Sequence, residues 1–472
     1  MTSLRFRLSS LALAALLAGC VNLAPTYSRP EAPIPSEWPA AGAKADDASV
    51  SAGTGRQGFI TDERLRRTIE LALANNRDLR VALQNIEKAR AQYGVQRAEL
   101  FPSVAATAGG TRQRTSASTS SSGESSFGST YTSALGFSSY ELDLFGRVRN
   151  LNEAALQSYL STEATTRSTR ISLVAEVASA WLTLAADNER LKLAQSTLAS
   201  QQRSYELTSR MKALGASTAL ALAQSQTTVD SARVDVASYT AQVAQDRNAL
   251  DLLAGATVPD ELLPPAGMAT ASALVDVPAG LPSTLLQQRP DVLAAEHTLQ
   301  GSNADIGAAR AAFFPTISLT ASAGSSSTAL SGLFKGGNST WSFAPSISLP
   351  IFNAGSNRAS LDSAKAQREI DLATYEKTVQ TAFKEVADAL AVRGSLGEQL
   401  AAQQSLVDAT QKSLTLSQAL YRNGSYSYLE VLDAQRSLYT AQQTLITLRL
   451  SEQSNRIMLY KVMGGGDTAS AG

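Results

Sequence analysis

The sequence predicts a mainly α-helical protein that carries a smaller β-sheet part, with one structural unit present twice. Long helices are predicted where the chain lacks both glycine and proline, over 147–214, 216–254 and 425–463. Two other segments, 103–146 and 315–355, have the alternation typical of paired β-strands. The two halves of the chain also align with each other in the same order of elements.

The composition excludes several classes of function. The 472 residues carry a formal net charge of zero, so the basic excess of a nucleic-acid-binding protein is absent. The chain has one Cys and one His, which leaves little scope for metal-cluster, thiol or histidine chemistry. We find no phosphate-binding loop, nucleophile elbow, zinc motif or dinucleotide fingerprint. The sequence therefore predicts a protein that is not an enzyme and holds no metal.

The N-terminus has the features of a secretion signal over residues 1–19. Arg5 and Arg7 precede a short apolar stretch, and Leu17-Ala18-Gly19-Cys20 resembles the cleavage box of bacterial lipoproteins. We expect a covalent lipid on Cys20 and no other cofactor, since acyl chains would anchor this end in a membrane. The alternative is an ordinary signal peptide with a Cys near its cleavage site. The proline-rich residues 20–60 are predicted to form an extended tether from the lipid.

The predicted helices have a coiled-coil period. Apolar residues recur every seven positions at Leu222, Val229, Val236, Val243 and Leu250. Val431, Leu438 and Leu445 repeat in the same way. If continuous, the stretch 147–214 would reach about 100 Å at about 1.5 Å per residue. A plain coiled coil would explain this pattern, but it would not explain the strand segments.

The strand segments alternate between an apolar face and a small polar face. The clearest strand, Trp341–Leu349, places large apolar side chains at every odd position, and Thr316–Ser322 alternates in the same way. A soluble sheet and a transmembrane β-barrel both fit this period. Four strands cannot close a barrel, and open edges are not tolerated in lipid. If the strands span a membrane, several copies of the chain must combine them.

The internal duplication extends over whole elements. A shift of 209 residues aligns Glu176 with Glu385, Gly215 with Gly424, and Gly255 with Gly464. A shift of 213 residues aligns Phe101-Pro102 with Phe314-Pro315. Each half is therefore predicted to consist of a helix, a strand hairpin, and two long helices joined by a turn.

Five motifs carry a resemblance to a known family. They are Asn76-Arg77-Asp78-Leu79-Arg80, Glu141-Leu142-Asp143-Leu144-Phe145-Gly146-Arg147, Arg289-Pro290-Asp291, Ala308-Ala309-Arg310-Ala311-Ala312-Phe313-Phe314-Pro315 and Leu432-Asp433-Ala434-Gln435-Arg436-Ser437-Leu438. With them the chain resembles the TolC family of outer-membrane efflux proteins, and most closely the OprM-type lipoproteins of resistance-nodulation-division multidrug efflux systems. The resemblance implies a homotrimer in which four strands per protomer form a twelve-stranded transmembrane barrel. The long helices would continue it as a periplasmic α-helical barrel.

This resemblance and the patterns together predict the following segments: a signal peptide (1–19), a lipid-anchored tether (20–60), periplasmic helices (61–102), a first barrel hairpin (103–146), a long helix pair (147–254), an equatorial segment (255–282), periplasmic helices (283–314), a second barrel hairpin (315–355), a second long helix pair (356–464) and a C-terminal tail (465–472).

The helix–helix turns are the predicted functional ends. Gly215 and Gly424 suit the left-handed backbone that ends a helix. By resemblance, these glycines together with Tyr421 and Arg422 form the tips where a periplasmic adaptor docks.

The resemblance also places a gate just inside the second turn. Leu429, Asp433 and Arg436 lie on one helix face by their spacing. In OprM-like proteins the matching residues line a closed aperture. The alternative is an ordinary Asp–Arg pair on a solvated helix, worth a few tenths of a kcal/mol.

The predicted function is the outer-membrane exit channel of a tripartite multidrug efflux pump, gated at the periplasmic helix tips. Its partners would be a periplasmic adaptor (membrane fusion) protein, an inner-membrane resistance-nodulation-division transporter and outer-membrane lipid, but no nucleic acid. A TolC-type duct for protein secretion or metal export remains an alternative. A periplasmic coiled-coil scaffold is a second one.

Overall fold

A computed structural model describes residues 21–35, 59–121, 123–265, 267, 283–425 and 427–465. The predicted signal peptide, Cys20, most of the equatorial segment and most of the C-terminal tail lie outside these residues. Seven α-helices and four β-strands make up the described part: α3 (Glu63–Asn75), α4 (Arg77–Ala98), β1 (Val104–Thr115), β2 (Ser126–Leu142), α5 (Arg147–Ala213), α6 (Ala219–Ala254), α7 (Pro290–Ala311), β3 (Thr316–Ser327), β4 (Ser339–Ser348), α8 (Ser356–Arg422) and α9 (Tyr428–Val462). Three short 3-10 turns, η1 (Asp260–Leu262), η2 (Ser283–Gln288) and η3 (Leu330–Gly332), lie between them.

The two longest helices, α5 and α8, have 67 residues each. At about 1.5 Å per residue, each is about 100 Å long. Both are free to continue because proline, which would remove a hydrogen bond and clash with the preceding turn, is absent from them. No helix of the described part is both long enough and apolar enough to cross a bilayer.

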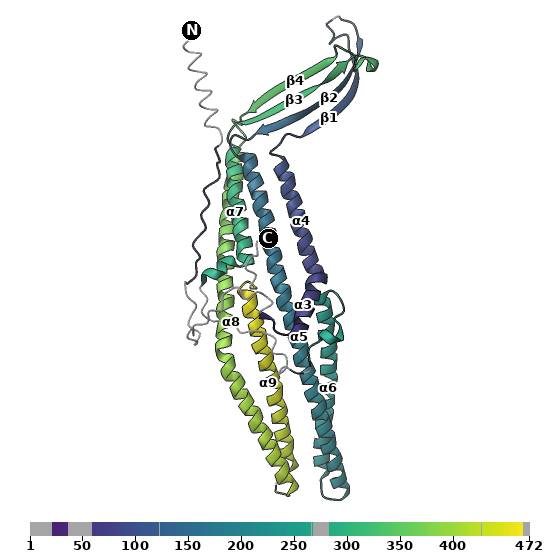
Figure 1. Cartoon of the computed structure of the whole chain (residues 1–472), viewed down its shortest axis with the longest axis vertical. Helices are drawn as coiled ribbons and strands as arrows, with labels where there is room; N and C mark the ends of the chain where they lie inside the picture. Colours follow the sequence, from purple (N-terminus) through teal and green to yellow (C-terminus); the bar gives the residue numbers. More distant parts are fainter. Residues whose placement is uncertain are drawn as a thin grey trace. The chain divides into compact units, whose positions relative to one another are not determined.

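The chain divides into two compact units. The first contains residues 1–31, 85–163 and 294–376, and the second contains 32–84, 164–293 and 377–472. The first unit holds the β-sheet and the first parts of α5 and α8, and the second holds the rest of the two helical hairpins, α5–α6 and α8–α9 (Figure 1).

The four strands of the first unit form one antiparallel sheet in the order β1-β2-β3-β4. Phe343 pairs with Ala321, Ala321 with Phe137, and Phe137 with Val104, so these residues share one face. The same face carries Trp341, Ile347 and Leu135, all of them exposed in the protomer. Mainly serine, threonine, glycine and alanine occupy the other face, together with Gln113 and Glu141. One face is therefore suited to lipid and the other to a polar interior.

A bulge in β2 keeps its apolar side chains on the same face. The pairing of β2 with β3 shifts between Phe137 and Tyr140, and Ser139 has a positive φ of 56°. After the shift, Tyr140 pairs with Leu319 and Leu142 with Ile317. Without the extra residue, the end of β2 would turn these apolar side chains toward the polar face.

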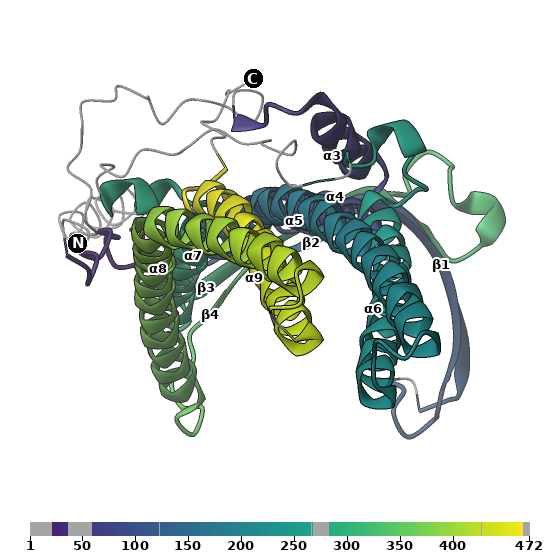
Figure 2. The same ribbon diagram turned by 90° about the horizontal axis from the view of Figure 1, so that it is seen from below.

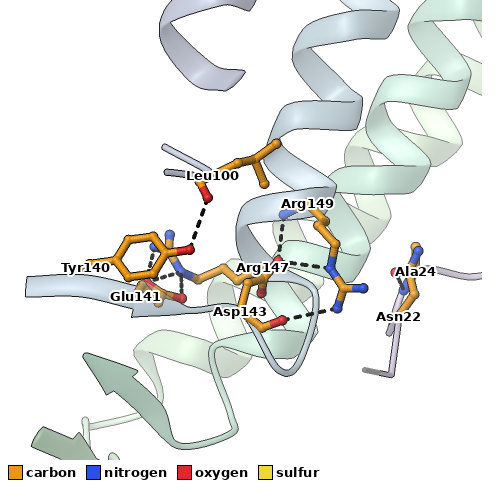
Figure 3. Close-up of polar contacts among 8 residues, drawn as sticks. All are labelled: Asn22, Ala24, Leu100, Tyr140, Glu141, Asp143, Arg147 and Arg149. Carbon is orange, nitrogen blue, oxygen red and sulfur yellow. Dashed lines mark hydrogen bonds and ion pairs between the residues drawn. The ribbon is translucent and has the colours of Figure 1, made fainter. Parts of the chain in front are cut away.

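The connection from β2 to α5 is held by two ion pairs (Figure 3). The guanidinium of Arg147 donates to Glu141, with Nε 2.9 Å from Oε1. Asp143 Oδ2 accepts from the backbone N–H of Arg149 at 2.8 Å and from its Nε at 3.2 Å. Between them, Gly146 has a φ of 78°, which favours glycine. These contacts give Glu141, Asp143, Gly146 and Arg147 each a structural role in the connection.

The second unit contains the main apolar core. Trp181 of α5 is fully buried and its indole N–H donates to the carbonyl of Leu262 at 2.9 Å. Leu65 and Ile69 of α3, Leu250 of α6 and Ile457 of α9 pack in the same cluster. The core thus joins four helices that are distant in sequence.

Residues 21–31, the N-terminal strap, lie along α7 in the first unit. Three polar side chains of α7, spaced seven residues apart, bind the strap. Arg310 Nη1 donates to the carbonyl of Leu23 at 2.9 Å, and Asn303 Nδ2 donates to that of Pro25 at 2.7 Å. The third, Glu296, is buried and accepts from Arg29 Nε at 2.7 Å and from Nη2 at 2.6 Å. This part of the predicted tether is therefore docked on the folded body.

Candidate functional site at the helix-hairpin tips

Both long hairpins turn through a glycine in the left-handed conformation. Gly215 has a φ of 77° and Gly424 a φ of 73°. The following residue donates back to the helix in each case, with Ala216 N 2.8 Å from Met211 O and Ser425 N 3.0 Å from Leu420 O. The glycine N–H donates to the carbonyl three residues earlier in both turns. Both are Schellman motifs, so the duplicated glycines end α5 and α8 by the same geometry.

The second helix of each hairpin begins after a hydroxyl-bearing residue. Thr218 Oγ1 accepts from the backbone N–H of Ala221 at 3.0 Å and so caps α6. At the start of α9, the hydroxyl of Ser427 donates to the carboxylate of Glu430. This hydrogen bond lowers the pKa of Glu430. The Ser-x-x-Glu spacing is a sequence signal for a helix start at this point.

A small apolar cluster fills the α8–α9 tip. Its buried members, Tyr428, Val431 and Leu432, pack against Leu414 and Tyr421. The rings of Tyr421 and Tyr428 lie 5.3 Å apart with an interplanar angle of 50°. The Tyr421 hydroxyl also lies 3.5 Å from Met211 Sδ on α5, so Tyr421 connects the two tips. Burial, and next the neighbouring Tyr428, raise the pKa of Tyr421.

The predicted gate residues lie on the opposite, exposed face of α9. Leu429 is 54% exposed, and the side chains of Asp433 and Arg436 are 72% and 68% exposed. Arg436 Nη1 is 3.9 Å from Asp433 Oδ1, a loose pair at the limit of an ion-pair contact. These three residues are therefore available to face whatever lies beside α9 in an assembly.

The equivalent positions of the other hairpin are uncharged. Leu220 is 68% exposed at the start of α6. Gln224 is half-buried, and Thr227 is exposed and donates to the backbone carbonyl of Gln224 at 2.7 Å. The two hairpins thus present apolar side chains at the same level, but only α9 adds a carboxylate and a guanidinium.

The predicted docking residues have unequal environments. Gly215, Arg422 and Gly424 are exposed at the ends of the hairpins, and both glycines have open space around them. Tyr421 is half-buried and takes part in the tip cluster. Figure 2 views the hairpins from this end.

Sequence reasoning missed a set of hydrogen bonds between α6 and α9. The Tyr439 hydroxyl donates to Asp235 Oδ2 at 3.0 Å, and Gln443 Nε2 donates to the Tyr239 hydroxyl at 3.1 Å. Burial, followed by the hydrogen bond to Asp235, raises the pKa of Tyr439. Asp235 and Tyr239 are four residues apart on α6, and so are Tyr439 and Gln443 on α9. This spacing, which places each pair on one helix face, was the signal in the sequence.

Among the described residues, no three His, Cys, Asp or Glu side chains gather as a metal site would.

Comparison with known proteins identifies the family. The family model described as "Outer membrane efflux protein" matches residues 68–256 and 281–465. The chain belongs to the outer membrane efflux protein family. The two matched segments correspond to the two halves of the chain, which confirms the predicted duplication.

Individual relatives agree along nearly the whole chain. The toluene efflux pump outer membrane protein TtgC of Pseudomonas putida is 51% identical over 462 residues, which cover 97% of this chain and 95% of TtgC. A crystal structure of a membrane protein from Pseudomonas aeruginosa has a TM-score of 0.89 at 42% identity, covering 95% of this chain and 99% of that one. The open state of the MtrE outer membrane channel of Neisseria gonorrhoeae has a TM-score of 0.84 at 37% identity, covering 94% and 98%.

These findings confirm the predicted fold class, localisation and general function. This outer membrane efflux protein is a mainly helical TolC-type channel whose four strands contribute to a trimeric barrel. It lies in the outer membrane and extends into the periplasm. The family is one of channels rather than of enzymes.

Proposed function

We propose that this channel is the exit duct of a tripartite drug-efflux pump and that it is closed at the α9 tip by Leu429, Asp433 and Arg436. The observation that carries the proposal is the exposed face of α9, where these residues stand next to the turn and opposite the buried tip cluster. Threefold symmetry would bring three copies of this face together around the axis. Each copy would contribute a leucine to the constriction and an Asp–Arg pair to its charge.

The proposed partners are a periplasmic adaptor (membrane fusion) protein and an inner-membrane transporter of the resistance-nodulation-division type. The toluene efflux pump outer membrane protein TtgC is named as a pump component, which supports this assignment. We propose that the adaptor docks on the tips around Gly215, Arg422 and Gly424, where Tyr421 joins the hairpins. Binding there would open the duct if the adaptor prefers the separated arrangement of the hairpins.

The proposed anchor is a lipid on Cys20. The N-terminal strap supports it. Residues 21–31 run along α7, and their N-terminal end, Val21 and Asn22, lies beside Gly146 at the base of the sheet. Metabolic labelling with a radioactive fatty acid would test the anchor, with Cys20→Ser as the unlabelled control.

Single-channel conductance in planar bilayers tests the gate. If these charged side chains contribute about 0.5 kcal/mol per copy to contacts that exist only in the closed channel, three copies change the ratio of closed to open channels by about tenfold. We expect Asp433→Ala and Arg436→Ala to raise the open probability by that order. The matched control is Asp230→Ala, which removes an exposed Asp–Arg pair of the same spacing from α6 (Arg233 Nη1 to Asp230 Oδ1, 3.3 Å).

The outcomes separate the alternatives. Equal open probability in wild type, Asp433→Ala and Arg436→Ala would move the gate away from these residues. An equal rise with Asp230→Ala would mean that the effect is general helix destabilisation. No conductance from trimeric protein would favour a scaffold without a pore.

A further inference from the structure

Two arginines lie on the apolar face of the sheet near the end of β1. Arg112 and Arg114 follow Val104, Ala106 and Ala108 at even positions, so all five side chains point to the same side. That side is the apolar face of the sheet, which faces lipid in a transmembrane barrel. Both arginines are exposed in the protomer. Cations on a lipid-facing surface are costly unless they reach the headgroup layer.

The two guanidinium groups lie close to the same aromatic ring. Phe127 of β2 pairs with Arg114 and is 69% exposed. Its ring centroid is 5.9 Å from Arg112 Cζ and 5.8 Å from Arg114 Cζ. Both cations therefore converge on one ring, which also suits the aromatic belt at a membrane interface.

The depth of this group along the strand matches a headgroup layer. From Val104 to Arg112 the strand rises by about 26 Å at about 3.3 Å per residue, or about 20 Å after tilting. This is close to the height of the apolar band, about 25 Å. Because α4 leads into the start of β1, the end that carries the arginines is the one away from the periplasmic helices. That end belongs to the outer leaflet.

The surface below the arginines can accept an acyl chain. Ala108 and Ala106 continue the same face toward the bilayer centre, and Leu135 of β2 pairs with Ala106. At Gly110 the ring of Tyr131 covers the backbone, because a Cβ there would lie 3.0 Å from Tyr131 Cδ1. Small apolar side chains thus lie beside larger ones along this face. Apolar contact there would add to the charge interaction above it.

The described residues offer the arginines no fixed carboxylate. Neither arginine takes part in an ion pair among the described residues, and the acidic residue nearest to them in the sequence is Glu124 in the β1–β2 loop. Arginine binds phosphate through two parallel hydrogen bonds, a geometry that lysine cannot reproduce. We propose that Arg112, Arg114 and Phe127 form a binding site for the phosphorylated headgroup of an outer-leaflet lipid, with an acyl chain lying over Ala108 and Ala106.

Native mass spectrometry of the full-length trimer tests this site. The probes are lipid A with two phosphates, dephosphorylated lipid A with the same acyl chains, and phosphatidylcholine. A basic side chain near an anionic surface contributes about a fivefold change in affinity. We expect Arg112→Gln/Arg114→Gln to weaken binding of phosphorylated lipid A about 25-fold and to leave the two other lipids unaffected.

Two further variants keep the test decisive. Lys335→Gln, which removes a positive charge from the loop of the other hairpin, should leave the affinity unchanged. Arg112→Lys/Arg114→Lys keeps the charge and should give an intermediate loss. Equal binding of phosphorylated lipid A to wild type and to the glutamine variant would overturn the proposal. So would dissociation of the glutamine variant into monomers with undiminished lipid binding, since the arginines would then serve the seam between copies.

Discussion

Asp246 is a carboxyl group buried inside the α5–α6 hairpin. One of its oxygens accepts from Gln242 Nε2 at 2.9 Å, and Asp187, a second buried acid, is its neighbour. Asp187 is in turn 2.5 Å from Arg190 Nη1. Burial raises the pKa of Asp246 to about 6, and the interaction with Asp187 acts in the same direction. Burial away from water and a neighbouring acid both favour the protonated form of Asp246, so this carboxyl holds its proton to a higher pH than an exposed one.

This proton makes the periplasmic hairpin sensitive to pH. The pKa of Asp246 in the folded state is above its unfolded value of about 3.9, so the folded chain binds more protons between these values. Its contribution to the free energy of unfolding is full below about pH 4 and is lost as the pH rises through about 6. We expect wild type to lose about 1 kcal/mol per protomer from this group between pH 5 and 7.5.

Thermal unfolding at the two pH values checks this expectation against Asp246→Asn, which cannot titrate. The variant should show a smaller fall in melting temperature than wild type. Asp230→Asn, an exposed aspartate on the same helix, should behave like wild type. An unchanged pH dependence in Asp246→Asn would contradict the assignment.

At the scale of the elements, the N-terminal strap depends on a glycine in α7. A Cβ on Gly307 would lie 2.5 Å from the side-chain Nδ2 of Asn150 and 2.8 Å from Ala24 Cα and Cβ, closer than real contacts allow. Gly301 lies on the same helix, and its Cβ would meet its nearest atom at 3.6 Å. The strap therefore approaches α7 most closely where the helix has no side chain.

We expect Gly307→Ala to displace the strap and Gly301→Ala to leave it in place. Both changes favour the helix by about 1 kcal/mol, so helix propensity cancels in the comparison. Hydrogen exchange of residues 21–31 is the measurement. Faster exchange in Gly307→Ala alone would agree with the structure, whereas equal exchange in both variants would show that the strap tolerates the added methyl group.

The elements also show where sequence reasoning succeeds. The glycine- and proline-free stretch beginning at Arg147 matches α5 within one residue, because an uninterrupted helix needs only the absence of breakers and a suitable end. The face that carries Leu429, Asp433 and Arg436 likewise follows from helical spacing alone.

Other features depend on partners that a linear pattern does not show. Strand β2 begins at Ser126, because Ser126–Thr130 pair with β1 although they are mostly small and polar, so composition does not mark this start. The bulge at Ser139 interrupts the period of two, so the alternation of this strand does not continue along its whole length. The three side chains of α7 that bind the N-terminal strap were not predicted. Two of their partners are backbone carbonyls, which no sequence pattern marks.

At the scale of the whole molecule, the sheet is an incomplete barrel. In the described chain, β1 and β4 each pair on one side only. Lipid cannot satisfy the hydrogen-bonding groups of the free edges, so copies of the chain must pair β1 with β4 of a neighbour. One face of the sheet then contacts lipid and must be apolar, whereas the other faces the channel interior and must be polar.

Adjacent residues of β4 test the two faces. Phe343→Arg places a cation on the lipid face at mid-strand, where it costs about 2–4 kcal/mol per copy, and we expect failure of membrane insertion. Ala344→Arg places the same cation on the polar face, and we expect normal trimers with altered ion selectivity. Membrane fractionation and unheated gel electrophoresis measure the first effect, and reversal potentials measure the second. Normal insertion of Phe343→Arg would contradict the assignment of the faces.

The free edges of the sheet have a genetic consequence. A channel built from three chains fails when one of them is defective, because each strand edge must pair with a neighbouring chain. A cell that makes equal amounts of an intact and a defective version would assemble only about one eighth of its channels from intact chains alone. A single damaged gene copy on a plasmid could therefore silence most of the transport encoded by a healthy chromosome, and export-deficient alleles of this protein are expected to be dominant.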